Sequence, residues 1–143
     1  RGLAAALALG AQGVVLGTAM IAAAEANMGD ATHRERVLAA TVDDTQYTEV
    51  HDIAQQRRWP PGIGGRTIVT PFTEKWHGRE AELREKRESA VDEPGARDDR
   101  DPTPAYAGQA AGLVHEVEPA AAIVERIVLQ AEDALQRASH HVD

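Results

Sequence analysis

The feature that most constrains the fold is a helix pattern followed at once by a short apolar run that ends in Gly17-Thr18. Residues 3–10, LAAALALG, are typical of a helix that ends at Gly10, and residues 13–16, GVVL, predict a short strand. In a barrel of alternating strands and helices, the loop after the last strand brings backbone amides to a phosphate. Gly17 allows the close approach that such a loop needs, and Thr18 adds a hydroxyl donor. The opening of the chain therefore predicts the end of a cofactor-binding barrel. The alternative is an ordinary strand-to-helix turn, in which Gly17 gives the tight geometry and the Thr18 hydroxyl caps the next helix.

The same residues bear on how much of a barrel the chain contains. The sequence starts at Arg1, its first methionine is Met20, and the helix pattern is already running at residue 3. We therefore expect these residues to be the C-terminal portion of a larger protein. The missing N-terminal part of the barrel would then be a partner that this chain needs for its stability and for its chemistry.

Composition narrows the function classes. The chain has 15 Lys and Arg residues against 23 Asp and Glu, a net charge of −8, and no basic stripe with interleaved aromatic residues, which argues against a nucleic-acid surface. It has no cysteine, which excludes disulfides, a thiolate nucleophile and a cysteine metal site. Because its histidines also lack metal-binding spacing such as HExxH, we expect no metal site.

One alternative concerns residues 2–24, which carry no charge and follow the positive Arg1, as in a signal peptide. Three glycines and Gln12 interrupt this run, and alanine contributes little to membrane insertion. We therefore expect a cytoplasmic protein with no membrane segment. An exported or anchored helical protein is the alternative.

The middle of the chain predicts short helices, a strand and a loop. Helices are expected over residues 19–26 and 33–40, and a short strand or extended arm over residues 45–50, TQYTEV. Residues 57–66 contain two prolines and three glycines, which favours a surface loop. From Pro71 a helix is expected to resume, with Phe72, Trp76 and Leu83 on its apolar side.

The last part of the chain predicts a linker, a turn and a long helix. Residues 92–104 are charged with almost nothing apolar, which favours a flexible linker. YAGQAAGL, residues 106–113, is a glycine-flanked turn, and Pro119 stands where prolines open helices. The apolar residues after it recur on one face, which should dock against the rest of the protein: Ala120, Ile123, Val124, Ile127, Val128, Ala131 and Leu135.

These segments predict an α/β fold, the C-terminal part of a TIM (β/α)8 barrel with its last helix and strand, followed by a mostly helical C-terminal extension. Residues 1–30 would form the last helix-strand-helix of a cofactor-binding barrel, and residues 31–91 a helical and loop extension. Residues 92–104 would be the linker. Residues 105–143 would form a glycine-rich turn and a C-terminal helix packed on the barrel.

Four separated pieces of the sequence carry a resemblance to a known family. They are RGLAAALALGAQGVVLGT at 1–18, LAATVDDTQYTEVHDIA at 38–54, RRWPPGIGGRTIVTPFTEKWHGRE at 57–80, and YAGQAAGLVHEVEPAAAIVERIV at 106–128. Together they resemble the C-terminal portion of the flavin-dependent nitronate monooxygenases, formerly called 2-nitropropane dioxygenases. The resemblance covers nearly the whole chain except the charged linker.

The resemblance implies that FMN is the cofactor and that its phosphate meets the backbone at Val15, Leu16, Gly17 and Thr18. It also implies oxidation of a small-molecule alkyl nitronate with oxygen to a carbonyl compound and nitrite. None of the six histidines matches the family's catalytic histidine, so the catalytic residue is unknown. The alternative is a flavin- or phosphate-binding TIM-barrel relative without nitronate turnover. Because most of the barrel would be missing, we expect the 143 residues alone to bind FMN weakly and to be inactive.

Some positions depart from the family pattern. Ala19 and Met20 stand where an arginine and an aromatic residue are usual, and the lost cation removes favourable electrostatics near a phosphate. Thr70 stands where asparagine is common. Gln109, in the glycine turn, is a candidate to reach the flavin or substrate from a flap. The simpler alternative, which we favour, is that its amide satisfies backbone groups of the loop.

Overall fold

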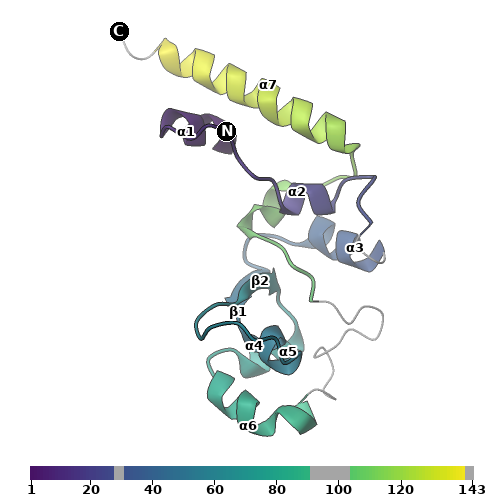
Figure 1. The fold of residues 1–143 in the computed structure, drawn as a ribbon. Coiled ribbons are helices and arrows are strands. Elements are labelled where there is room, and N and C mark those ends of the chain that lie inside the picture. Colours follow the sequence, from purple (N-terminus) through teal and green to yellow (C-terminus); the bar gives the residue numbers. More distant parts are fainter. Residues whose placement is uncertain (28–30, 91–103, 141–143) are drawn as a thin grey trace.

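The structure is a computed structural model that describes residues 1–27, 31–90 and 104–140. Its elements, in chain order, are α1 (Gly2–Ala8), α2 (Thr18–Ile21), α3 (Ala31–Ala39), β1 (Thr45–Thr48), α4 (Val50–Ala54), β2 (Gly65–Ile68), α5 (Pro71–Trp76), α6 (Glu80–Ala90), the 3-10 helix η1 (Gln109–Leu113) and α7 (Ala120–Ser139). They form an elongated arrangement with α1 and α7 at one end and α4, α5 and α6 at the other (Figure 1). The predicted linker, residues 92–104, lies outside the described residues except for Pro104.

At one end of the molecule α7 lies beside α1, although more than one hundred residues separate them in the chain (Figure 1). The segments that lead away from α1 and back to α7 also meet: the N–H of Ala24 donates to the carbonyl of Glu118 at 2.8 Å. The long helix after Pro119 is confirmed. Of its apolar face, Ile123 and Ala131 are buried, whereas Val124, Val128 and Leu135 stay exposed within this chain.

The N-terminal segment differs from its prediction in two respects. Residues 13–17 have no regular secondary structure, and no strand forms there, because no neighbouring strand in the described part of the chain pairs with them. The side chain of Val15 is accordingly 100% exposed. The helix expected over residues 19–26 is also wrong, since α2 ends at Ile21 and a turn follows. Among the described helices, none has the length and apolar character required to cross a membrane.

The middle of the molecule holds a small hydrophobic cluster where α3 meets η1. Its buried members are Val37 and Ala40 from one side and Ala107 and Ala111 from the other. Before η1, the chain runs along the edge of β2: the N–H of Ile68 donates to the carbonyl of Ala105 at 2.8 Å, and the N–H of Ala107 to that of Arg66 at 3.1 Å. The segment around Tyr106 is thus fixed to the sheet by backbone hydrogen bonds.

The strand expected near residues 45–50 is confirmed as β1, which pairs antiparallel with β2 in the register Thr45↔Ile68 to Thr48↔Gly65. Gly64 comes so close to β1 that a Cβ there would lie 2.3 Å from the carbonyl oxygen of Thr48, so only glycine fits. The helix α4 between the strands was not predicted. It has five residues and no side-chain N-cap, and its burial of Val50 and Ala54 stabilises it instead.

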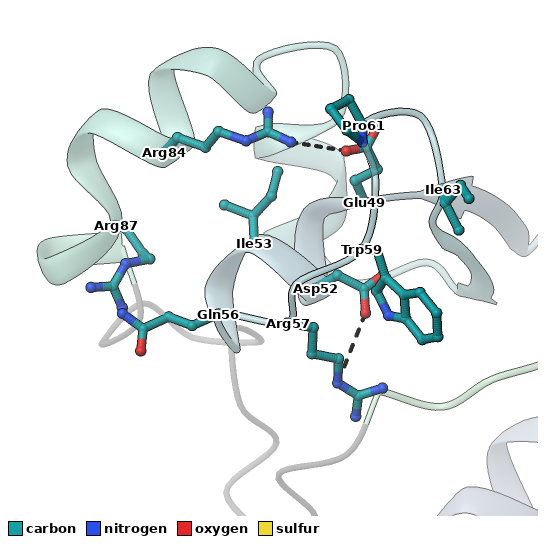
Figure 2. A pocket seen from close by; sticks show the side chains of 10 residues that line it. All are labelled: Glu49, Asp52, Ile53, Gln56, Arg57, Trp59, Pro61, Ile63, Arg84 and Arg87. Atoms are coloured by element: carbon teal, nitrogen blue, oxygen red, sulfur yellow. Dashed lines mark hydrogen bonds and ion pairs between the residues drawn. The ribbon is translucent and has the colours of Figure 1, made fainter.

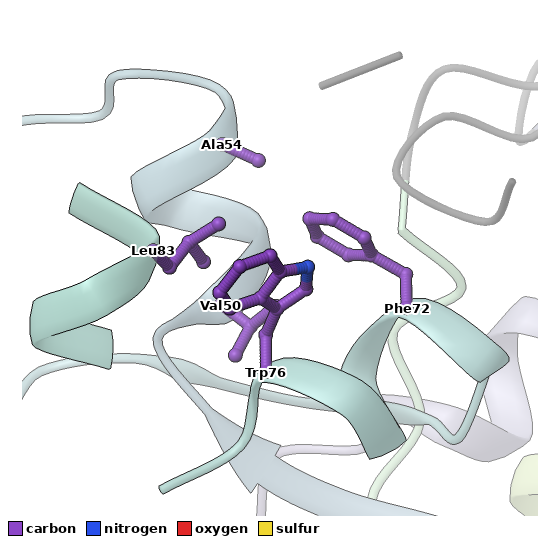
Figure 3. Close-up of a cluster of buried hydrophobic side chains, with 5 residues drawn as sticks. All are labelled: Val50, Ala54, Phe72, Trp76 and Leu83. Atoms are coloured by element: carbon purple, nitrogen blue, oxygen red, sulfur yellow. The ribbon is translucent and has the colours of Figure 1, made fainter. Parts of the chain in front are cut away.

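The far end of the molecule is built on the second hydrophobic cluster, Val50, Ala54, Phe72, Trp76 and Leu83 (Figure 3). Phe72, Trp76 and Leu83, the predicted apolar residues of the helix expected from Pro71, are therefore confirmed as core residues. The expectation of one continuous helix is wrong, because α5 ends at Trp76 and the chain turns through Gly78, whose φ of +78° favours glycine. The turn lets α6 pack back on α4.

Candidate functional site

The predicted phosphate-binding tip lies where the segment after α1 enters the helix α2. Residues 13–17 have no regular secondary structure, Gly17 is the N-cap, and α2 begins at Thr18. The side chain of Thr18 is turned inward, with an exposed fraction of 9%, and its Oγ1 accepts a hydrogen bond from the N–H of Gly108 at 2.8 Å. Because a hydroxyl can accept and donate at once, Thr18 retains its proton for a second acceptor.

The residues present fit the phosphate end of a flavin nucleotide. A Cβ built on Gly17 would meet nothing within 4 Å, so the space in front of it is open. The N–H groups of Thr18 and Ala19 stand in the first turn of α2, where no acceptor in the helix is available to them. Because α2 has only four residues, individual N–H groups and the hydroxyl would hold an anion there, with little help from a helix dipole.

Gln109 is brought to this tip by the hydrogen bond between Gly108 and Thr18. It is exposed at the start of η1. From the other side, Nε2 of His33 lies 2.9 Å from the carbonyl oxygen of Tyr106 and holds the same segment to α3. Sequence reasoning singled out Thr18 and Gln109, but nothing in the sequence indicates that the segments that carry them touch.

Two departures from the family pattern have structural explanations. Thr70 is the N-cap of α5: its side chain accepts from the N–H of Thr73, whose own side chain accepts from the N–H of Thr70. Threonine and asparagine are both good N-caps, so this exchange preserves the helix start. Ala19 is half-buried and lines a hollow of about 380 Å³ between α1, residues 113–118 and α7. No cation can come from that position.

His51 and Asp52, adjacent in the sequence, do not act as a pair. His51 is 4% exposed, its two ring nitrogens have no hydrogen-bond partner in the described part of the chain, and its ring centroid lies 5.9 Å from that of Phe72. Oδ1 of Asp52 instead lies 3.8 Å from Nε of Arg57. Burial lowers the pKa of His51 from 6.5 to about 4, so the ring packs as a neutral group. The described residues also contain no cluster of side chains able to hold a metal ion.

Acid should destabilise the fold through His51. Its folded-state pKa of about 4 lies below the unfolded value of 6.5, so the unfolded chain binds the proton first as the pH falls. Its contribution to stability is therefore complete above pH 6.5 and is lost between pH 6.5 and about 4, by about 3 kcal/mol in total. Urea unfolding measured across this pH range would test it. His51→Leu, which cannot be protonated, should flatten the profile, and an unchanged profile in that variant would contradict the assignment.

Comparison with known proteins shows which proteins this chain is similar to. The description of the family model that matches the chain, over residues 1–130, is nitronate monooxygenase. The nitronate monooxygenase npaC of Metarhizium robertsii is 32% identical over 152 residues, which cover 99% of this chain and 41% of that protein.

The same coverage appears among solved structures. The structure of FabK from Thermotoga maritima superposes on 99% of the chain with a TM-score of 0.77 and 27% identity, and this chain covers 44% of it. The M276A mutant of that protein gives a TM-score of 0.68 and 26% identity, with 40% of its length covered. The chain thus spans less than half the length of each of these relatives.

Proposed function

Because this chain belongs to the nitronate monooxygenase family, we propose that it is part of a flavin-dependent oxidoreductase and carries the end of the barrel that holds the cofactor phosphate. In this proposal α1, residues 13–17 and α7 are the last helix, strand and helix of a TIM barrel. The side-by-side packing of α1 and α7 supports it, because consecutive helices of such a barrel are neighbours on its outer ring. Residues 31–118 would then extend from the barrel rim.

The observation that carries the proposal is the start of helix α2 at Gly17-Thr18, with Thr18 held by Gly108. Val15, Leu16 and Gly17 would present backbone to the FMN phosphate, and the hydroxyl of Thr18 would donate a hydrogen bond to a phosphate oxygen. Gln109, which follows Gly108 in the chain, would face the rim near the flavin or substrate. In this proposal these backbone groups and side chains bind and orient the cofactor or substrate, and none of them transfers a proton.

When bound, FMN would supply the electron chemistry that oxidises an alkyl nitronate with oxygen to a carbonyl compound and nitrite. Nitronate and oxygen are thus the proposed small-molecule partners, and the cytoplasm the proposed location. The second candidate is a flavin- or phosphate-binding relative without nitronate turnover. It is favoured by Ala19, which leaves the phosphate without the family's usual cation.

The whole protein, expressed in its natural length, separates these candidates. We expect flavin absorbance in the visible range, and oxygen uptake with nitrite release that depends on an added alkyl nitronate. The 143-residue chain alone should retain little FMN, because most of the barrel would be missing. Flavin without nitronate-dependent oxygen uptake would support the second candidate, and a purified protein that takes up no flavin would overturn both.

A further inference from the structure

A second hollow lies between α4, α6 and the loop of residues 57–63 (Figure 2). These elements are at the end of the molecule away from α1 and α7 (Figure 1). Its volume is about 320 Å³. Three arginines reach it from two separate segments, Arg57 from the loop and Arg84 and Arg87 from α6. The proposed FMN phosphate site uses none of these residues, so the hollow needs an explanation of its own.

The charges around this hollow do not cancel. Arg84 pairs with Glu49 at 2.9 Å, and Arg57 lies 3.8 Å from Asp52. In the amide orientation that satisfies both groups, the guanidinium of Arg87 meets a neutral partner among the described residues: the amide oxygen of Gln56 accepts from its two terminal nitrogens at 2.6 and 2.8 Å. Among the described residues that line the hollow, three cations therefore face two carboxylates. Burial also raises the pKa of Asp52, which disfavours the charged form of one of those carboxylates.

Gln56, which makes this contact, has an unfavourable backbone conformation. Its φ is +57°, in the left-handed region where glycine is favoured and where other residues cost about 1 kcal/mol of conformational free energy. The turn itself ends α4, with the N–H of Arg57 donating to the carbonyl of Asp52 at 2.8 Å. A glycine would make the same turn without strain, but it has no side chain to contact Arg87. The amide of Gln56 makes that contact and orients Arg87 at the hollow.

The wall beside these arginines is apolar. Ile53 lies between the α6 arginines and the loop, and Trp59, Pro61 and Ile63 line the loop side (Figure 2). Trp59 is 58% exposed and Ile63 47% exposed, so both present apolar surface to whatever enters. A guanidinium matches a carboxylate in a planar two-point geometry, and an indole offers its face to a planar group.

We propose that this hollow binds a small organic carboxylate with a planar apolar body, its carboxylate held by Arg87 and its body lying along Ile53 and Trp59. The one excess positive charge among the described lining residues suits one carboxylate. Because Gln56 already holds the guanidinium of Arg87 in a fixed orientation, less conformational entropy is lost on binding. The proposal stands apart from the flavin chemistry, and either can fail without the other.

Benzoate, titrated into the whole protein by calorimetry, is the probe. We expect saturable binding with a Kd in the millimolar range or tighter, and Arg87→Gln should weaken it about tenfold or more. Lys86→Gln removes the same charge from the next position of α6, outside the hollow, and should change the Kd by less than about twofold. Gln56→Gly should weaken binding without lowering the midpoint of urea unfolding, because it relieves the strained turn.

Several outcomes would overturn the proposal. Benzyl alcohol binding as tightly as benzoate would mean an apolar hollow with no anion site. Equal weakening by Lys86→Gln and Arg87→Gln would mean unspecific attraction by α6. Binding of an acidic peptide with no response to benzoate would mean a protein-docking surface. Flavin content, measured on the same samples, should be unchanged in all three variants, so a negative result would leave the proposed function as it stands.

Discussion

Replacing Trp76 with alanine should lower the free energy of unfolding by about 4 kcal/mol, the cost typical of deleting a large aromatic side chain from a packed core. Trp76 is 2% exposed and lies at the centre of the cluster formed with Val50, Phe72 and Leu83 (Figure 3). The chain has one phenylalanine and two tryptophans in all. No other large side chain is therefore at hand to fill the cavity, and α5 and α6 would lose their common support.

Urea unfolding followed by far-ultraviolet circular dichroism measures this loss. Trp59→Ala is the matched control, because it deletes the same side chain from a position that is 58% exposed, and it should cost less than about 1 kcal/mol. Equal losses in the two variants would show that burial in this cluster does not determine stability. Trp59→Ala should instead weaken the benzoate binding proposed for the second hollow.

The second large effect is expected at Thr18. In the whole protein Thr18→Val should weaken FMN binding by about 10- to 100-fold, since it removes one hydrogen bond to a charged group. Valine keeps the shape of threonine but cannot accept from the N–H of Gly108, which lies 2.8 Å from Oγ1. The segment that carries Gln109 would therefore lose its contact with the tip at the same time.

Thr18→Ser separates these causes from general damage. Serine keeps the hydroxyl and should retain FMN within about threefold of the unaltered protein, as expected where the hydrogen bond and not the methyl group decides. Flavin fluorescence released on dilution gives the dissociation constant for each variant. If valine and serine bound FMN equally well, the phosphate would have to lie away from the Thr18 hydroxyl, and the proposed cofactor site would be wrong.

Local patterns were sufficient for several elements. The periodicity after Pro119 predicted α7, the β-branched run predicted β1, and the spacing of Phe72, Trp76 and Leu83 predicted core positions. Each of these signals is contained in a window of a few residues and reports which face is apolar. The prediction failed for α4, because its five residues are too few to show a periodic pattern. It also failed at the break between α5 and α6, because that break depends on one backbone angle, at Gly78.

The sequence by itself determined the family, the elements β1 and α7, and the Gly17-Thr18 tip as a candidate for phosphate, because these depend on residue types in local order. Only the tertiary structure decided that Gly108 reaches Thr18 and that Arg57, Arg84 and Arg87 line one hollow. Such contacts join residues tens of positions apart, and no local propensity encodes them. They follow from how helices and strands bury their apolar faces together, which fixes distances that the order of residues leaves open.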